Sequence, residues 1–228
     1  TPRTSSAASD VYKRQPDNTP NDNDRVEIGP TALAFTEWEN LGLSAPDMPA
    51  LREYRLSRLQ DQIRQHDCAG LLLFDPLNIR YATDTTNMQL WIAHNMARAC
   101  FVPPEGKVIL WDFHNCEHLS AHLPLVGEVR HGASFFYFET GDQTEQAAAA
   151  FAEQVLDVMR QHAGTNKRLA VDKIENIGYV SLCSRGVEVL EGQVLTEHAR
   201  SIKNENELRA MRCACLLYTS DAADDVRG

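Results

Sequence analysis

The chain has 228 residues, of which 43% are hydrophobic, and its 22 basic and 32 acidic side chains give a formal net charge of −10. An acidic chain without a basic stripe argues against nucleic acid or an anionic membrane surface as a partner, and its apolar runs fall far short of the roughly 20 residues of a membrane helix. The six cysteines show no C-x-x-C spacing, so we expect reduced thiols in a cytoplasmic protein.

The two ends of the chain look foreign to the rest of it. Residues 5–15 can be encoded by a DNA string whose reverse complement encodes residues 215–224, as when a sequencing adapter is translated at both ends of an insert. We therefore expect residues 1–15, which should be disordered, and 215–228 to be adapter-like, and we leave both out of fold reasoning. Residues 16–30 nearly lack apolar side chains and are predicted to be a mobile leader, the first part of a leader or arm over 16–48.

The first predicted elements are a helix and a strand. Apolar residues recur at helical spacing over 49–67 and predict an amphipathic helix. The apolar run 69–74 predicts a fully buried strand. Asp75-Pro76 then predicts a turn that starts a short helix, because proline is tolerated in the first helical turn.

A hairpin is predicted next, because the apolar runs 97–102 and 107–111 flank a Pro-Pro-Glu-Gly turn. Asp142 and Glu145 resemble an N-terminal capping pair for an Ala-rich helix that Gly164 ends. The remaining predicted elements are a strand over 168–171, a helix over 175–182, a strand over 187–190 and a helix start at Asn204 with Glu207. Together they predict an α/β domain with a mixed sheet flanked by helices.

Three histidines at positions 114, 118 and 122 require a metal site to be considered. On a helix the outer two would lie about 12 Å apart along the axis, too far for one ion with ligand bonds of about 2 Å. We therefore favour chance histidines on a partly exposed helix. The chain also lacks G-x-G-x-x-G, G-x-x-x-x-G-K-[ST], G-x-S-x-G and H-E-x-x-H, so no metal ligand and no catalytic residue is predicted in it.

The strongest local signal is Phe-Asp-Pro-Leu-Asn-Ile-Arg-Tyr-Ala-Thr-Asp at 74–84, followed by Asn-Met-Gln-Leu-Trp at 87–91. It resembles the N-terminal domain of the creatinase/aminopeptidase P (pita-bread) superfamily, and in particular that of DddP-type dimethylsulfoniopropionate lyases. Residues 28–35 and 135–138 are similar as well. The resemblance implies a creatinase N-terminal-like (ribonuclease H-like) domain over 49–199.

The far end of the chain resembles the opening of the superfamily's catalytic domain. Arg200, Ile202, Lys203 and Glu207 match its R-x-I-K segment and first helix, so residues 200–214 are expected to start a truncated catalytic domain. The family's metal pair, divalent or iron ions held by two Asp, one His and two Glu, would lie downstream. The resemblance therefore implies no cofactor and no activity for this fragment.

The resemblance also implies a homodimer, because in relatives the N-terminal domain of one subunit leans over the active site of the other. By position, Trp91 matches an aromatic residue that helps to seat the sulfonium substrate in trans. A sulfonium cation over an indole gains cation–π energy of up to about 2 kcal/mol. The alternative is that Trp91 packs in the core or the dimer interface. Asn78, Arg80 and Tyr81 are predicted to be structural, and Asp84 a turn or cap residue.

Three functions stay open for the parent protein. The first is a metal-dependent lyase that eliminates dimethyl sulfide from dimethylsulfoniopropionate and leaves acrylate. The second is an Xaa-Pro aminopeptidase or prolidase, in which a metal-bound hydroxide attacks a peptide carbonyl. The third is a non-catalytic pita-bread protein that only binds partners. Fold alone does not decide among them.

Overall fold

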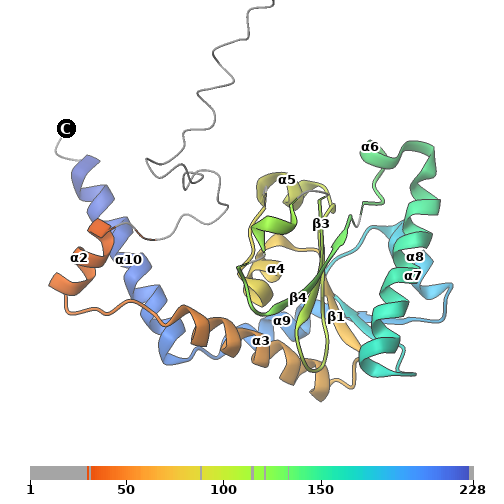
Figure 1. Cartoon of the computed structure of the whole chain (residues 1–228), viewed down its shortest axis with the longest axis horizontal. Helices are drawn as coiled ribbons and strands as arrows, with labels where there is room; N and C mark the ends of the chain where they lie inside the picture. The colour runs from red at the N-terminus through yellow and green to blue at the C-terminus, as the bar shows by residue number, and fades with distance from the viewer. Residues whose placement is uncertain are drawn as a thin grey trace, which may run out of the picture.

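The computed structural model describes residue 30 and residues 32–87, 89–113, 116–120, 122–132 and 134–225, without the side chains of 89–91, 117 and 216–225. Residues 1–29, with the predicted adapter-like segment and the start of the arm, lie outside the described residues. A six-stranded mixed sheet forms the centre, with helices on both faces (Figure 1). The predicted α/β fold class is confirmed.

The sheet has the strand order β4-β3-β2-β1-β5-β6. Its strands are β1 (Gly70–Leu73), β2 (Ala99–Val102), β3 (Val108–Asp112), β4 (Val126–His131), β5 (Arg168–Val171) and β6 (Glu188–Glu191). β2 pairs antiparallel with β1 and with β3, as the predicted hairpin requires, and the pairs β1–β5, β3–β4 and β5–β6 are parallel. The carboxyl ends of all strands except β2 therefore meet at one edge of the sheet, together with the amino end of β2. We call this the carboxyl edge.

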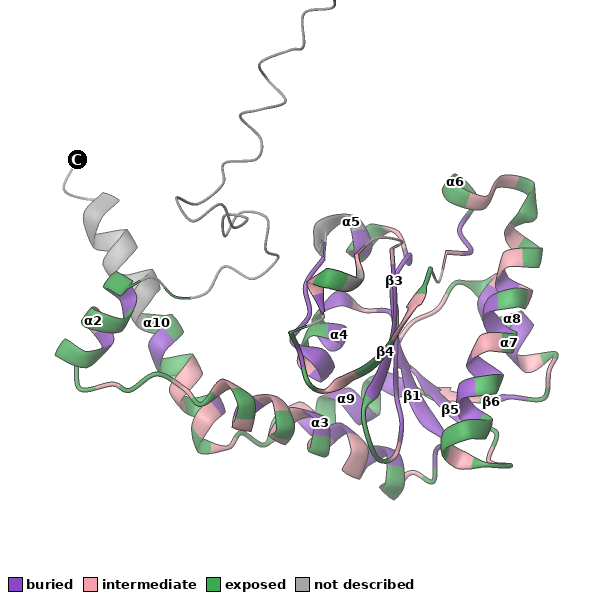
Figure 2. Ribbon diagram, in the orientation of Figure 1, coloured by how far each residue is buried: buried purple, intermediate pink, exposed green. Residues whose placement is uncertain are grey.

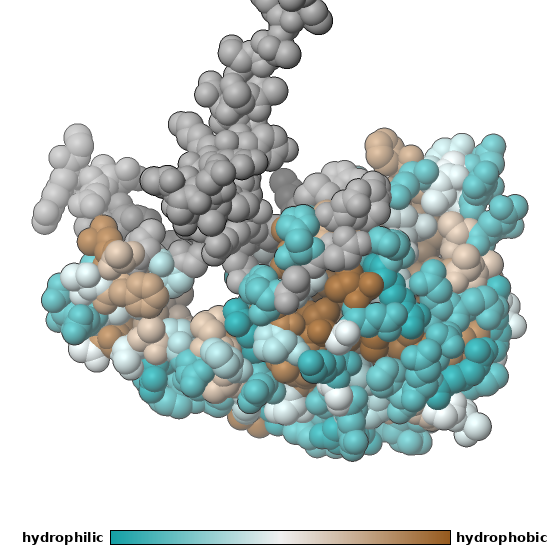
Figure 3. Space-filling view, in the orientation of Figure 1, coloured by the Kyte–Doolittle hydropathy of each residue, from teal (hydrophilic) through white to brown (hydrophobic). Residues whose placement is uncertain are grey.

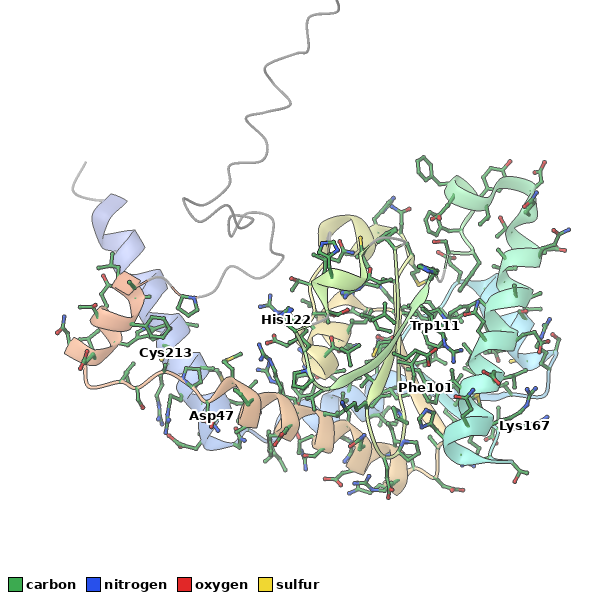
Figure 4. The ribbon with its side chains drawn as sticks, in the orientation of Figure 1. Asp47, Phe101, Trp111, His122, Lys167 and Cys213 are labelled. Carbon is green, nitrogen blue, oxygen red and sulfur yellow. The ribbon has the colours of Figure 1, made fainter. Side chains whose placement is uncertain are left out.

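Each face of the sheet has its own hydrophobic core. On one face α3 (Met48–Gln65), α4 (Pro76–Thr83) and α9 (Gly192–Ser201) bury Leu59, Ile79 and Leu195 against the strands. On the other face α7 (Thr144–Ala163) and α8 (Asn176–Cys183) bury a second cluster around Phe151. Figure 2 shows buried residues along the strands and on the sheet-facing sides of these helices. Trp111 of β3 points toward α7, where its indole N–H donates to Gln154 at 2.8 Å (Figure 4).

Two predicted helix ends are confirmed, and one predicted start is not. α3 begins after Asp47, whose carboxylate accepts from Ala50 N at 3.0 Å, and α7 ends at Gly164, where φ is 62°. The prediction of Asp142 as the cap of α7 is wrong. Asp142 lies in the short 3₁₀ helix η3 (Gly141–Gln143), and α7 follows Gln143, whose side chain makes no cap hydrogen bond.

Two helices extend away from this sheet body. α2 (Ala32–Asn40) packs on α10 (Glu205–Asp225), where the Trp38 indole N–H donates to Cys213 O at 3.1 Å. We call this pair the α2–α10 arm (Figures 1 and 4). The predicted helix start at Asn204 is confirmed, because its side chain accepts from Glu207 N at 2.9 Å.

Several elements were not predicted from the sequence. They are α2, α5 (Gln89–His94), η2 (Glu117–Leu119), β4, α6 (Tyr137–Thr140), η3 and α9. Within the described part of the chain, no helix is both long and apolar enough to cross a membrane.

Candidate functional site

The carboxyl edge is built around a buried carboxylate, Asp172, which follows β5. It accepts four hydrogen bonds of 2.7–3.0 Å, from the backbone N–H groups of Phe74, Asp75 and Lys173 and from the Asn78 amide. Burial raises the pKa of Asp172, and these hydrogen bonds act in the opposite direction. Because its acceptor sites are occupied, Asp172 fixes the turn from β1 into α4, and Asn78 has the predicted structural role.

Two of the sequence segments that carry the family resemblance, 74–84 and the segment that begins at Arg200, contact each other. Arg200 Nη1 donates to Asn78 Oδ1 at 3.0 Å. The Tyr81 ring lies near the guanidinium groups of Arg55 and Arg200, 5.2 and 6.0 Å from their central carbons. Arg55 also pairs with Glu207 at 2.8 Å. Burial, followed by the nearby Glu207 carboxylate, raises the pKa of Tyr81. Tyr81 is thus a structural residue, as predicted, and joins α4 to α3 and α9.

Asp84 ends α4, as the sequence predicted. Its φ of 62° lies in the left-handed region, which Asp adopts more readily than most residues. Its carboxylate pairs with Arg52 at 2.8 Å, and Arg80 approaches it at 3.8 Å with an exposed side chain. The chain therefore leaves α4 in a fixed direction toward the carboxyl edge.

The loop between α4 and β2 is described at residues 85–87 and 89–98, and a buried ion pair lies at its base. Arg98 and Asp112 are both 0% exposed, and Arg98 Nε donates to Asp112 Oδ2 at 2.9 Å. The Asn87 amide donates to Asp112 Oδ1 at 2.9 Å, and Arg98 Nη2 donates to the Thr85 hydroxyl at 2.6 Å. Side chains at both ends of the loop thus meet at one carboxylate.

The loop carries α5, and α5 carries Trp91. Ile92 of the same helix is fully buried and anchors it. The side chain of Trp91 lies outside the described residues, so its predicted contact with the substrate stays a prediction. The structure does place the backbone of Trp91 at the carboxyl edge, because α5 precedes the amino end of β2.

Two exposed aromatic residues lie on another connection from the same edge. Tyr137 and Phe138 of α6, which follows β4, are 71% and 84% exposed, whereas Phe135 is buried against Phe74 and Phe151. Figure 3 shows apolar surface at α6. The aromatic run 135–138 of the family resemblance thus has one anchored end and one exposed end.

The predicted helix with three histidines is wrong, because only the 3₁₀ turn η2 forms there among the described residues. No continuous helix reaches His122, because residue 120 already lies in a turn. His118 and His122 are exposed, and His114 lies outside the described residues. Within the described ranges, no three His, Cys, Asp or Glu side chains come together as metal ligands.

Residues 55–179 match the family model described as the Creatinase/Prolidase N-terminal domain. The chain belongs to this family. It is 52% identical over 198 residues to the dimethylsulfoniopropionate lyase DddP of Roseovarius nubinhibens and 50% identical over 198 residues to that of Roseobacter denitrificans, each match covering 87% of this chain and 44% of the relative. The predicted membership of the pita-bread superfamily, and the closeness to DddP, are confirmed.

The creatinase/prolidase domain has the same fold as a solved prolidase. The prolidase of Thermococcus sibiricus aligns with a TM-score of 0.54 and 16% identity, over 78% of this chain and 44% of that protein. At this identity the likeness shows the fold alone. The chain spans less than half of the length of the curated relatives that it matches.

Arg98 and Asp112 were not singled out from the sequence. Each is a charged residue beside an apolar run that forms a buried strand. A charge in such a place needs a buried partner, and that signal would have singled out both residues. It would not have paired them with Asn87 or Thr85, because those contacts depend on how the loop closes.

Proposed function

We propose that this chain is the N-terminal domain of a metal-dependent dimethylsulfoniopropionate lyase, and that it forms a homodimer and covers the active site of its partner. The identity of 52% over 198 residues with a dimethylsulfoniopropionate lyase carries this proposal. In this proposal residues 49–199 form the domain, 16–48 an arm, and 200–214 the start of the catalytic domain. The compartment is cytoplasmic.

The reaction is an elimination. A base removes the proton on the carbon next to the substrate carboxylate, the electron pair forms the carbon–carbon double bond of acrylate, and the carbon–sulfur bond breaks to release dimethyl sulfide. A pair of divalent or iron ions, held by the catalytic domain, supplies the electrophilic chemistry in the parent protein. The described residues of this chain bring together no ligand set for such ions, so no step is assigned to them here.

The role of this domain is to bind and orient the substrate. The substrate carries a sulfonium cation, and an indole face attracts a desolvated cation by up to about 2 kcal/mol. We propose that Trp91 supplies this face in trans. Its position on α5 at the carboxyl edge, beside connections that project from the sheet, supports the proposal.

The test uses the parent gene, extended beyond the codon for residue 214 and expressed at full length. We expect dimethyl sulfide by gas chromatography when dimethylsulfoniopropionate is added, and a Trp91→Ala variant with a KM raised about tenfold or more, because about 1.4 kcal/mol corresponds to tenfold. Thermal stability should change little. Cleavage of Xaa-Pro peptides instead would identify a peptidase, and neither activity would identify a binding protein. Equal turnover in the parent and Trp91→Ala would remove Trp91 from the site.

A further inference from the structure

The edge strand β4 lacks most of the features that protect the edge of a sheet. It lies at one end of the strand order and, with six residues, is the longest of the six strands. An edge strand presents backbone N–H and C=O groups to any further strand, and proteins commonly protect it by a short length, lysine or proline. β4 has neither lysine nor proline. In the described part of the chain, this edge is open to pairing.

Apolar side chains accompany the open edge. Leu125, Val126 and Val129 are partly exposed, and Figure 3 shows apolar surface where Figure 1 has β4. The one irregularity in the pairing of β4 with β3 lies between Val108 and Ile109, so residues 128–131 continue in regular register. A further strand would cover apolar surface and satisfy backbone groups at the same time.

The charges of β4 decide which strand fits this edge. Glu128 and Arg130 lie two residues apart, so their side chains share one face of the sheet, and Arg130 Nε donates to Glu128 Oε1 at 2.8 Å. Two copies of β4 that pair antiparallel about Val129 place Glu128 of each copy opposite Arg130 of the other, which is a favourable cross-strand pair. Centring the pair on Glu128 or on Arg130 would instead put two like charges face to face. The charges therefore specify one register.

The other edge of the sheet does not have this property. β6 carries Glu188 and Glu191 and no basic residue, so two copies of β6 would bring acidic side chains together. Two whole chains also repel each other, because each has a net charge of −10. Self-pairing thus needs a local attraction, which β4 offers and β6 does not.

We propose that β4 pairs with β4 of a second copy of this chain, antiparallel about Val129, so that the two sheets join into one continuous sheet. This interface goes beyond the proposed function and does not rest on lyase activity, so the outcome of the lyase assay does not affect its test. Because the paired strands run in opposite directions, the carboxyl edges of the two copies point in opposite directions. Each carboxyl edge thus stays available for the substrate role proposed above.

Sedimentation velocity of the chain at increasing concentration measures this self-association. We expect the unmodified chain to form a concentration-dependent dimer. Arg130→Glu leaves two acidic side chains on the edge, and Glu128→Arg leaves two basic ones. Each change replaces two attractions across the interface by two repulsions, so each variant alone should dimerise at least about tenfold more weakly.

Mixing the two variants separates a contact between chains from one within a chain. In an equimolar mixture an acidic edge meets a basic edge, so we expect a heterodimer, although each chain still holds like charges at positions 128 and 130. Glu188→Arg makes the same kind of change on the other edge and is the control, which should dimerise like the unmodified chain. A mixture without heterodimer would overturn the proposal.

Two further results would also overturn it. One is an unmodified chain that stays monomeric at every concentration. The other is a dimer that persists in both variants, because the contact would then lie on another surface, such as the α2–α10 arm.

A second measurement covers the case in which a variant does not fold. Arg130 lies over the Trp111 ring at 5.7 Å, so circular dichroism must show that Arg130→Glu folds. If it does not, amide hydrogen exchange of the unmodified chain decides. The amides of residues 126–131 should exchange more slowly at high protein concentration than at low concentration, and equal rates would overturn the proposal.

Discussion

The sheet body and the α2–α10 arm differ in how much of their own surface they bury. The body has a hydrophobic cluster on each face of its sheet. The arm has a cluster of three buried residues, Ala34, Trp38 and Cys213, and leaves Leu33 and Met211 more than half exposed. Since hydrophobic burial is the main favourable term in folding, the body can hold its shape by itself, whereas the arm relies on few contacts.

The largest effect is expected from a variant that creates a cavity in the sheet body. Phe151→Ala removes a ring that packs on Phe74, Trp111 and Phe135 at centroid distances of 5.3–5.8 Å. We expect it to lower the free energy of unfolding by about 3–5 kcal/mol, measured by urea denaturation. Trp38→Ala, in the arm, should shift the same transition by less than about 1 kcal/mol, because the arm can open without the body. Equal shifts would mean that body and arm unfold as one unit.

A smaller effect is expected at the junction between body and arm. Arg55→Leu leaves the Glu207 carboxylate, which is 3% exposed, without its partner. We expect a loss of about 1–3 kcal/mol and faster amide hydrogen exchange in α10 by mass spectrometry. Arg64→Leu on the same helix is the control, because its pair with Asp61 is exposed and should contribute less than about 1 kcal/mol. Unchanged exchange in α10 would show that this ion pair does not hold the arm.

The smallest effect is confined to alkaline pH. Burial raises the pKa of Cys100, in the body, from 9.0 to about 12. The native thiol therefore keeps a proton that the unfolded thiol releases. The resulting stability is fully present below about pH 9 and is lost as the pH rises toward 12, by at most about 1.4 kcal/mol per pH unit.

Urea denaturation at pH 8, 9 and 10 measures this loss. Cys100→Ala should show a shallower decline than the parent protein, because it lacks the thiol. Tyr81, whose pKa is also raised, contributes in the same direction to both proteins and cancels in the difference. Parallel declines would contradict the assignment to Cys100.

Elements with strong local signals were predictable from the sequence. The helix over 49–67, the strand over 69–74 and the hairpin each have a continuous apolar pattern, and the structure has α3, β1 and the β2–β3 pair there. β4 escaped because it is an edge strand with Gly127, Glu128 and Arg130 in it, and most of its residues are partly or fully exposed. β4 is held in the sheet by its pairing with β3, and its sequence lacks the apolar alternation from which a strand can be predicted.

Helix α9 was not predicted from the sequence, for a different reason. It begins at Gly192, a residue that disfavours helix interiors. The structure explains this choice, because a Cβ at Gly192 would lie 2.5 Å from the backbone carbon of Val171. Only glycine permits the helix to start so close to β5. A contact between residues so far apart in the sequence leaves no local pattern.

The candidate site was predictable only in part. The segment 74–91 was singled out from the sequence, and the structural roles of Asn78, Tyr81 and Asp84 were predicted correctly. The base of the loop was not predicted, because Asn87, Arg98 and Asp112 come from three separate segments that only the folded sheet brings together. Local sequence patterns indicate helical or strand periodicity and helix caps. A buried polar network depends on tertiary structure, so no local pattern indicates it.

The contacts of Asp112 also separate the loop into a stem and a tip. The stem is held by side chains from outside the tip, and Asp112 belongs to a strand that the tip does not alter. Ile92, Met96 and Ala97 of the tip are buried, so they belong to the scaffold. For protein engineering, the exposed positions Ala93 and His94 are the place to exchange side chains without rebuilding the sheet.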